Sequence, residues 1–237
     1  FVKGCQVHSG INFGEAEKIW SLFEPFQGYG FNKAHAACYG RVAYQTAYMK
    51  ANFPGEYMCA VLTAETGNIE TVAEIINECK RMGIPVLPPD INISLKDFTL
   101  IKGQTSDAND QIRFGLLTIK NLGKAIAEAI IEERESGGSF NNIEDFVTRV
   151  HHKDLNKKSM ESLICSGAFD HLGERATLLA SVDLLLNYSR ENQRVFNSGQ
   201  VSLFGEVSET LPALRLQEVI PARRSQKRMW EKELLRL

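Results

Sequence analysis

Apolar residues recur at helical spacing along most of this chain. In the segment 15–26 they fall at positions i, i+3, i+7 and i+10, which predicts an amphipathic helix. The segment 34–52 is apolar nearly all round, and such a helix is expected to be buried or to face a ligand. Pro54 suits the first position of a further helix over 55–65. The N-terminal part of the chain is therefore predicted to be helical.

The pattern changes in the middle of the chain. Asn68 can cap a helix that Gly83 closes, because Asn favours the start of a helix and Gly its end. The prolines of the segment 84–90 predict an extended connector. Short apolar runs at 98–101 and 111–115 flank a polar loop and predict a small β-hairpin.

Beyond the hairpin, the apolar spacing is helical again to about residue 194. Polar residues 197–200 then mark a linker, and a basic helix is expected over 222–237. The predicted fold class is mainly α with one small β-hairpin.

The composition is that of an ordinary soluble globular protein, with 43% hydrophobic and 24% charged residues. No run of about 18 apolar residues occurs, so no contact with a membrane is expected. The five cysteines are odd in number and widely spaced, which favours reduced thiols in a cytoplasmic protein over disulfides or a zinc site. The chain starts without Met and without a signal peptide, so we expect a piece of a longer protein.

Charge is distributed unevenly. The net charge is −2, whereas a free-standing DNA-binding protein is usually basic. Residues 61–150 contain 9 basic and 14 acidic residues, but residues 220–237 contain 6 basic and 2 acidic ones. Any binding of nucleic acid must therefore use local basic patches.

A Gly-x-Gly turn followed by a helix is the most informative motif, and it spans residues 28–39. Asn32, Lys33, His35 and Tyr39 place an amide, an ammonium, an imidazole and a phenol in the first turns of that helix. A helix N-terminus carries unpaired N–H groups and partial positive charge, so it suits a phosphate. The alternative is a capped helix whose polar side chains are simply solvated.

A second motif has the spacing of a helix-hairpin-helix element. Asn121, in place of the more usual glycine, can adopt a left-handed conformation; Leu122 can enter the core, and Gly123 lets the backbone turn tightly. The second helix then begins near Lys124 with free N–H groups that can bind a DNA phosphate, while Lys120 or Lys124 adds charge. The alternative is an ordinary helix–turn–helix pair within a core.

A weaker hairpin of the same kind follows about 45 residues later in the chain, a separation that suits paired elements of this type. Its turn contains Ser166 and Gly167, between the helical segment that ends near Cys165 and the run Leu172–Arg175. Basic residues precede it, namely Lys153, Lys157 and Lys158.

These motifs together resemble the alpha subunits of bacterial DNA polymerase III, the C-family replicative polymerases. The fingers region of that family is similar to GYGFNKAHAACYGRVAYQTAYMKANFPGEYMCAVLTAE. Its tandem hairpins resemble the runs 114–123 and 163–173, so the resemblance covers roughly residues 1–205. The family usually has Ser where this chain has Ala34, and no role is carried over to that position.

The resemblance implies a function for each motif. Asn32, Lys33, His35 and Tyr39 match positions that face the incoming deoxynucleotide, and the two hairpins match elements that bind duplex primer-template DNA. Other replisome subunits are expected partners. The resemblance implies four parts: the C-terminal part of the fingers (1–90), a tandem helix-hairpin-helix domain (91–196), a linker with a clamp-binding motif (197–221) and the start of a next domain (222–237).

The linker contains a candidate peptide ligand, and its five residues are Gln200, Val201, Ser202, Leu203 and Phe204. Two adjacent large apolar residues in a polar stretch need a partner surface, which is either a folded neighbour in the same protein or an apolar pocket on another one. The pentapeptide resembles the internal motif with which this family binds the sliding clamp, the beta subunit.

Catalytic chemistry is not evident in the sequence. Polymerisation needs two metal ions held by paired carboxylates, and there is no Asp-x-Asp on a predicted strand. Asp90, Asp107 and Asp110 are expected to be solvated turn residues, and the pair His151–His152 lacks ligands at metal spacing. We expect this piece to hold no cofactor and to be inactive alone, with Mg²⁺ bound elsewhere in the intact nucleotidyltransferase.

Two other functions fit parts of the sequence. A non-enzymatic DNA-binding module would need the hairpins but neither the 28–39 motif nor the clamp-like pentapeptide, and a pure assembly scaffold would need none of these. Within the polymerase family, an error-prone relative is an alternative to the replicative enzyme.

Overall fold

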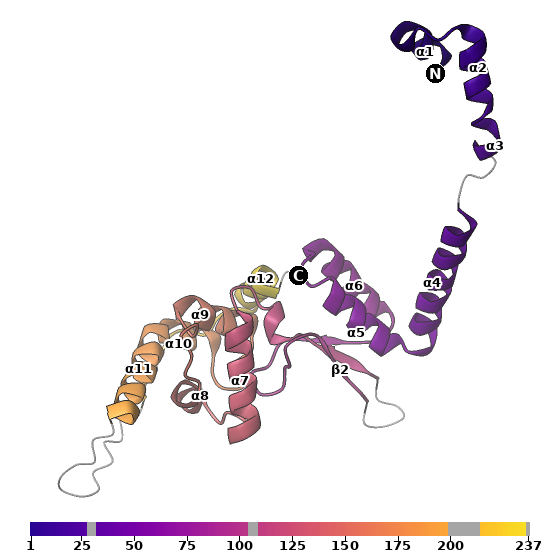
Figure 1. Ribbon diagram of the computed structural model, residues 1–237. Coiled ribbons are helices and arrows are strands. Elements are labelled where there is room, and N and C mark those ends of the chain that lie inside the picture. The colour runs from indigo at the N-terminus through magenta and orange to yellow at the C-terminus, as the bar shows by residue number, and fades with distance from the viewer. Residues whose placement is uncertain (28–31, 104–108, 199–213, 236–237) are drawn as a thin grey trace, which may run out of the picture. The chain divides into compact units, whose positions relative to one another are not determined.

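The structure is a computed structural model, and it describes residues 1–27, 32–103, 109–198 and 214–235. It divides into two compact units, Phe1–Phe53 and Pro54–Leu237. The prediction of a mainly α fold is confirmed, since helices make up most of both units (Figure 1).

The first unit consists of helices. These are α1 (Val2–Ser9), α2 (Phe13–Ser21), α3 (Glu24–Gln27) and α4 (Lys33–Asn52). The single helix predicted over 15–26 is wrong, because the chain breaks between α2 and α3. Pro25 explains the break: it has no N–H to donate, and its ring would clash with the carbonyl of Ser21 in a continuous helix.

Helix α4 forms almost where its pattern predicts, but its environment differs from one expectation. The side chain of Asn32 caps it by accepting a hydrogen bond from the Ala34 N–H at 2.9 Å. The sequence predicts that this helix is either buried or faces a ligand. None of its residues is buried in this chain, so the first alternative is wrong and the second stays a prediction.

The second unit begins with two helices on a small sheet. Helix α5 (Pro54–Ala64) and helix α6 (Ile69–Arg81) pack against each other, and both contact the strands. The Asn68 side chain accepts from the Thr71 N–H, and Gly83 follows α6 with a φ of +75°, as the cap pattern predicts.

The sheet contains the predicted hairpin and one strand more. Strands β2 (Thr99–Ile101) and β3 (Gln111–Arg113) are antiparallel, whereas β1 (Val86–Leu87) pairs with β3 in parallel, so that the order is β1-β3-β2. The extended connector 84–90 thus supplies an edge strand. Its prolines fit an edge, where a missing N–H breaks no hydrogen bond between strands.

The rest of the second unit is helical. Its elements are the short 3-10 helix η1 (Leu116–Thr118) and helices α7 (Lys124–Gly137), α8 (Ile143–Arg149), α9 (Lys157–Ser166), α10 (Arg175–Ala180), α11 (Val182–Ser198) and α12 (Arg224–Leu235). The rings of Phe140, Phe146 and Phe169 stack edge to face in the core, with centroids 4.8–5.0 Å apart.

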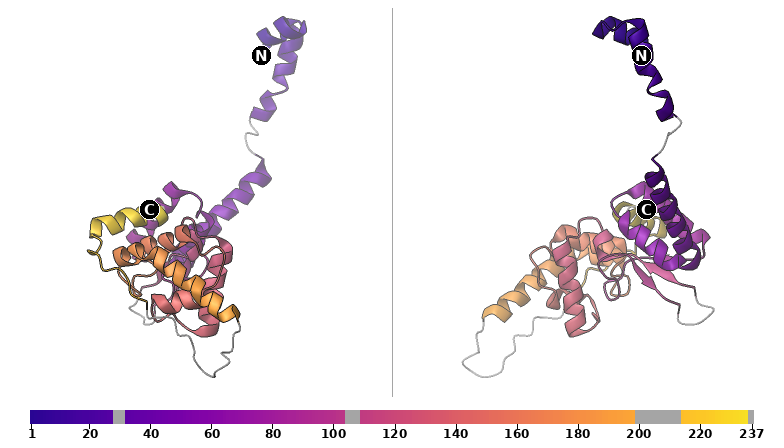
Figure 2. Two further views of the ribbon diagram at one scale, coloured as in Figure 1. Left: turned by 90° about the vertical axis from the view of Figure 1, so that its left-hand side faces the viewer. Right: turned by 45° about the vertical axis from the view of Figure 1, so that its right-hand side comes forward.

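Helix α12 is the basic helix expected near the C-terminus. It packs against α9, with Leu234 and Leu235 buried. The left view of Figure 2 shows α12, in yellow, beside the other helices of the second unit. The Lys120 N–H donates to the Leu234 carbonyl at 3.0 Å, which ties α12 to the chain just before α7. The predicted domain boundaries stay predictions.

In the described part of the chain, no helix is both long enough and apolar enough to cross a bilayer.

Candidate nucleic-acid interface

The turn of the first hairpin has the conformation that its sequence predicts. Asn121 has a φ of +67° and is the one non-glycine residue with positive φ among the described residues. Its side-chain N–H donates to the Ser162 hydroxyl at 3.1 Å, and this bond ties the turn to α9. Leu122 is 6% exposed and belongs to the core, as expected. A short polar turn is thus held between two buried anchors.

The helix that follows the turn begins without a side-chain cap. Gly123 occupies the cap position, and the first turn of α7 contains no acidic residue. Among the described residues, the N–H groups of Gly123, Lys124 and Ala125 have no hydrogen-bond partner. Lys120 and Lys124 are both exposed beside them. This end of α7 therefore presents free donors and positive charge to solvent.

Gly123 does not have the conformational role predicted for it. Its φ is −79°, which any residue can adopt, and an added Cβ would meet no atom within 4 Å. The left-handed conformation lies at Asn121 instead. The absent side chain at position 123 leaves open space next to the free N–H groups.

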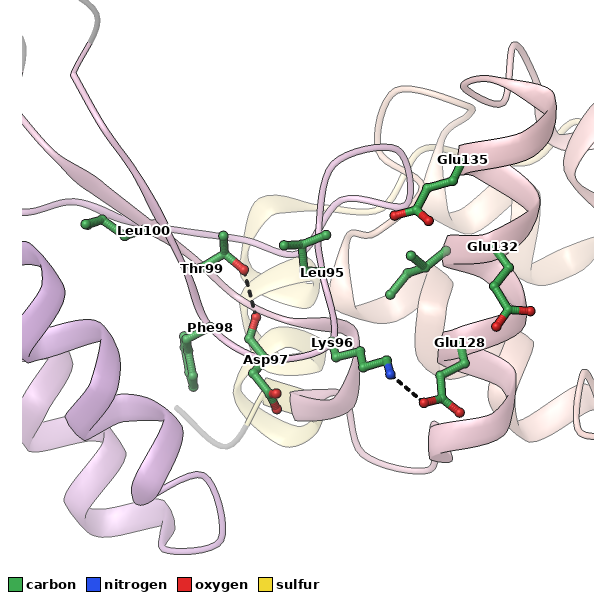
Figure 3. A pocket seen from close by; sticks show the side chains of 10 residues that line it. Leu95, Lys96, Asp97, Phe98, Thr99, Leu100, Glu128, Glu132 and Glu135 are labelled. Atoms are coloured by element: carbon green, nitrogen blue, oxygen red, sulfur yellow. Dashed lines mark hydrogen bonds and ion pairs between the residues drawn. The ribbon is translucent and has the colours of Figure 1, made fainter.

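One acidic side chain lies one turn further along α7. Glu128 accepts a hydrogen bond from Lys96 (Figure 3). Its carboxylate is also 3.9 Å from the Lys124 ammonium. The hydrogen bond from Lys96 lowers the pKa of Glu128. The Lys124 ammonium is too far from Glu128 for a hydrogen bond and stays exposed to solvent.

The second hairpin turns at a glycine that the packing requires. Gly167 has a φ of +89°, and an added Cβ would lie 2.4 Å from a guanidinium nitrogen of Arg175. Its N–H donates to the carbonyls of Leu163 and Ile164. Ser166 is fully buried, and its hydroxyl donates to the Leu163 carbonyl at 3.0 Å. The Gly167 N–H and the Ser166 hydroxyl are thus already hydrogen-bonded within the protein.

The helix after the second turn is capped by a carboxylate. One oxygen of Glu174 accepts from the N–H groups of Ala176 and Thr177 at 2.6 and 3.2 Å. The other accepts from the Ala222 N–H at 3.0 Å and lies 3.2 Å from the Lys227 ammonium. Burial alone would raise the pKa of Glu174, but these hydrogen bonds outweigh it and lower the pKa. An acid of the protein therefore occupies the place that a phosphate would take.

A buried arginine supports that arrangement. Arg175 is 3% exposed, and its guanidinium pairs with Asp170 and with Glu231, each at 2.7 Å. Burial disfavours its charge, but the hydrogen bonds to the two carboxylates prevail and raise its pKa. It also donates to the Cys165 carbonyl, so it joins α9, the second turn and α12.

The sequence did not indicate the roles of Glu174 and Arg175. Glu is not among the preferred cap residues, so Glu174 gave no signal of the usual kind. Arg175 and Glu231 are 56 residues apart, and no local spacing relates them. The run Glu174–Arg175 directly before a helical pattern was the one available sign.

The predicted nucleotide-facing residues lie at the start of α4. The rings of His35 and Tyr39 are in contact, with centroids 4.2 Å apart and planes tilted by 53°, and Tyr39 is 64% exposed. Lys33 is exposed beside them, whereas the side-chain oxygen of Asn32 caps the helix. The structure thus brings Lys33, His35 and Tyr39 onto the first two turns, and Asn32 serves the backbone. The preceding residues 28–31 lie outside the described residues.

Two further expectations concern the clamp and metal ions. The pentapeptide Gln200–Phe204 lies outside the described residues. The described residues hold no group of three or more His, Cys, Asp or Glu side chains that could bind a metal ion.

Comparison with known proteins finds one family model and several relatives that match parts of this chain. A family model described as a helix-hairpin-helix motif matches residues 83–178, which include both turns. The chain is 44% identical over 209 residues to the DNA polymerase III alpha subunit of Thermus aquaticus, and 42% identical over 210 residues to that of Escherichia coli (strain K12). Each match covers 88% of this chain but 16% and 18% of the relative.

The chain therefore spans less than a fifth of the length of these relatives. The resemblance predicted from the motifs is confirmed: most of the chain is homologous to one segment of DNA polymerase III alpha subunits, and that segment includes a helix-hairpin-helix region.

Proposed function

Because most of this chain is homologous to one segment of DNA polymerase III alpha subunits, we propose that it acts within a DNA-directed DNA polymerase that replicates DNA. Its role there is to hold duplex primer-template DNA, to help seat the incoming deoxynucleotide and to connect the polymerase to its sliding clamp. The free, cation-flanked start of α7 is the observation that carries the DNA-binding part of this proposal.

The first hairpin would bind the DNA backbone. The N–H groups of Gly123, Lys124 and Ala125 have the direction and charge that suit one phosphate, and the side chains of Lys120 and Lys124 can reach it or its neighbours. Leu122 in the core and the Asn121 bond to Ser162 hold the turn in place. Contacts of this kind position the duplex without reading its sequence, as a replicative polymerase requires.

The second hairpin would contribute mainly support. Its Glu174 cap leaves fewer donors for a phosphate, and the Ser166 hydroxyl is already bonded. The Gly167 N–H is also bonded, to the Leu163 and Ile164 carbonyls, so a DNA contact at Ser166 and Gly167 would have to compete with these internal bonds. We infer that the second hairpin chiefly fixes α9, which in turn holds Asn121.

The start of α4 would face the incoming deoxynucleotide. Lys33 offers a point charge for a phosphate, and the adjacent rings of His35 and Tyr39 offer an exposed aromatic surface for a base or sugar. Asn32 would act indirectly, because its cap fixes the first turn on which the other three stand. The unburied surface of α4 fits a ligand-facing helix.

Residues 200–204 would bind the sliding clamp, with Leu203 and Phe204 in an apolar pocket and Gln200 bonded beside it. Nucleotide transfer itself would use Mg²⁺ ions held by carboxylates in another part of the polymerase.

The DNA-binding proposal can be tested by fluorescence polarisation with a labelled primer-template duplex at several salt concentrations. Replacing Lys120 and Lys124 by Gln should reduce the magnitude of the log–log salt slope by about 1.8, since each lost phosphate contact removes about 0.9. The control K80Q/R81Q makes the same charge change on α6 and should leave the slope within about 0.5 of the wild type. Equal slopes for all three proteins would contradict the proposal.

The clamp proposal needs its own experiment. Binding of the chain to a bacterial sliding clamp should be micromolar and should disappear in the variant L203A/F204A. A folded wild-type chain that does not bind the clamp would exclude this role and leave the DNA-binding proposal unaffected.

A further inference from the structure

The second unit contains a pocket whose charged groups are all basic. This basic pocket, of about 340 Å³, lies between the loop that joins α8 to α9 and helix α11. Lys153, Arg190, His151 and His152 are the charged or titratable residues that line it. The whole chain has 29 acidic and 27 basic residues, so a lining without any carboxylate departs from the average composition.

A second pocket in the same unit has the opposite character. It lies between residues 95–100 and α7, has a volume of about 650 Å³, and is shown in Figure 3. Asp97, Glu128, Glu132 and Glu135 line it, against the single cation of Lys96. An anion would be repelled from this acidic pocket and attracted to the basic one.

The two permanent cations of the basic pocket are not used for structure. Among the described residues, no carboxylate lies within 4.0 Å of the Lys153 or Arg190 cation. Within the described part of the chain, Arg190 donates one side-chain hydrogen bond, to the Asn187 side-chain oxygen at 3.3 Å. Arg149, at the end of α8, is different: it is largely buried and pairs with Glu133 and Asp145. Cations that support the fold in this region are thus paired, whereas those of the pocket are free to bind a ligand.

The loop also orients a hydrogen-bond donor. The Nδ1 atom of His152 accepts from the Asp154 N–H at 3.2 Å. A neutral ring in this arrangement carries its proton on Nε2, which can donate to a ligand. The Asp154 carboxylate is 3.7 Å from Nδ1 and is not part of the pocket lining.

Apolar groups form the remaining surface of the pocket. Val150 and Leu186 are 1% and 7% exposed and line it together with Leu155. Gln193 and Ser189 add polar groups from α11. A ligand for this lining combines an anionic group with a flat or apolar part, and a nucleotide has both.

We propose that the basic pocket binds a phosphate ester of the nucleotide class, with the phosphate at Lys153, Arg190 and the imidazole of His152 and the sugar or base against Val150 and Leu186. The site is separate from the first hairpin, and it does not depend on the proposed replication function. Two sources share this chemistry, namely a free nucleotide and the phosphorylated end of a nucleic-acid strand.

The pocket can be tested by two-dimensional NMR of the isotope-labelled full chain. Titration with deoxyadenosine monophosphate should shift the amide signals of residues 151–153 and 189–193. The variant K153Q/R190Q should raise the dissociation constant at least about tenfold, because it removes both permanent cations that can hydrogen-bond an anion. Both side chains are exposed, so the variant should keep the wild-type spectrum elsewhere.

Controls separate this site from general attraction of anions. K80Q/R81Q has the same net charge as K153Q/R190Q and should bind the nucleotide like the wild type. Deoxyadenosine, without the phosphate, should shift the same amides at least about tenfold more weakly. Unaltered affinity in K153Q/R190Q, equal binding of the nucleoside, or no shift at tens of millimolar nucleotide would overturn the proposal.

A short single strand with a terminal phosphate identifies the source. Tighter binding than that of the mononucleotide would assign the pocket to a strand end, and weaker binding would assign it to a free nucleotide. The hairpin proposal is tested by duplex binding through Lys120 and Lys124, and this one by nucleotide-induced shifts at residues 151–153 and 189–193, so a failure of one can be told from a failure of the other.

Discussion

The two hairpins of the second unit use a helix N-terminus in opposite ways. At the first, Gly123 precedes α7 at the cap position without a side chain to cap it, and two exposed lysines lie nearby. At the second, Glu174 precedes α10 at the cap position, and its carboxylate accepts from the N–H groups of Ala176 and Thr177. The comparison teaches that a hairpin motif alone does not determine function: the residue at the cap decides whether the helix end can accept an external anion.

The glycines of the two turns show the same contrast between a packed hairpin and an accessible one. Gly167 is required by its φ of +89° and by the close approach of Arg175, whereas Gly123 has an ordinary φ and open space around it. The second hairpin is thus built for packing and the first for access. The bond from Asn121 to Ser162 connects the two roles, because the packed α9 holds the exposed turn.

The largest expected effect is on stability and comes from the second hairpin. Arg175→Met should lower the free energy of unfolding by about 3 kcal/mol, since it leaves Asp170 and Glu231 without their buried partner. Urea unfolding followed by circular dichroism measures this change. Lys124→Gln, at the first hairpin, should change the same free energy by less than about 0.5 kcal/mol. Equal stability of the two variants would break the comparison.

The next effect sharpens the contrast between the glycines. Gly167→Ala should cost about 2–3 kcal/mol, because Ala is strained in the left-handed region and its Cβ would push on Arg175. Gly123→Ala should cost less than about 1 kcal/mol, the difference between Gly and Ala at a helix cap. Both values come from urea midpoints at a common m-value. A larger loss for Gly123→Ala would contradict the assignment of roles.

A smaller effect should depend on pH. Hydrogen bonding lowers the pKa of Glu174 in the folded state despite partial burial, so its stabilising contribution is present above the unfolded value near 4.5 and is lost as the pH falls through the folded pKa. Glu174→Gln should therefore lower the free energy of unfolding by about 1 kcal/mol at neutral pH. The loss should be smaller at acidic pH, where Glu174 of the folded wild type is protonated.

Unfolding curves of the wild type and Glu174→Gln at neutral and acidic pH measure this difference. Glu191→Gln, an exposed change on α11, serves as the control and should show little effect at either pH. A stability gap for Glu174→Gln that stays constant with pH would show that the charge of the cap does not contribute.

Local features were predictable from the sequence because they depend on a few neighbouring residues. The caps at Asn68 and Gly83 and the left-handed Asn121 follow from the properties of those residue types, and the structure confirms them. The break at Pro25 was equally local, but the apolar spacing across it masked the signal.

Features that depend on distant contacts were not predictable. Strand β1 exists because Val86 and Leu87 pair with β3, and two residues carry no pattern of their own. The Arg175 network joins three segments, so neither its burial nor the Glu174 cap could be derived from spacing. The contrast between the hairpins therefore became visible in the structure, although both turns were found in the sequence.

Mapping the DNA contact on the backbone tests the central claim most directly. In two-dimensional NMR of the isotope-labelled chain titrated with a primer-template duplex, the amide signals of Gly123, Lys124 and Ala125 should move strongly, because their N–H groups gain a phosphate partner. Those of Ala176 and Thr177 should stay in place, because Glu174 already holds them. Large shifts at Ala176 and Thr177 with none at Gly123–Ala125 would contradict the account.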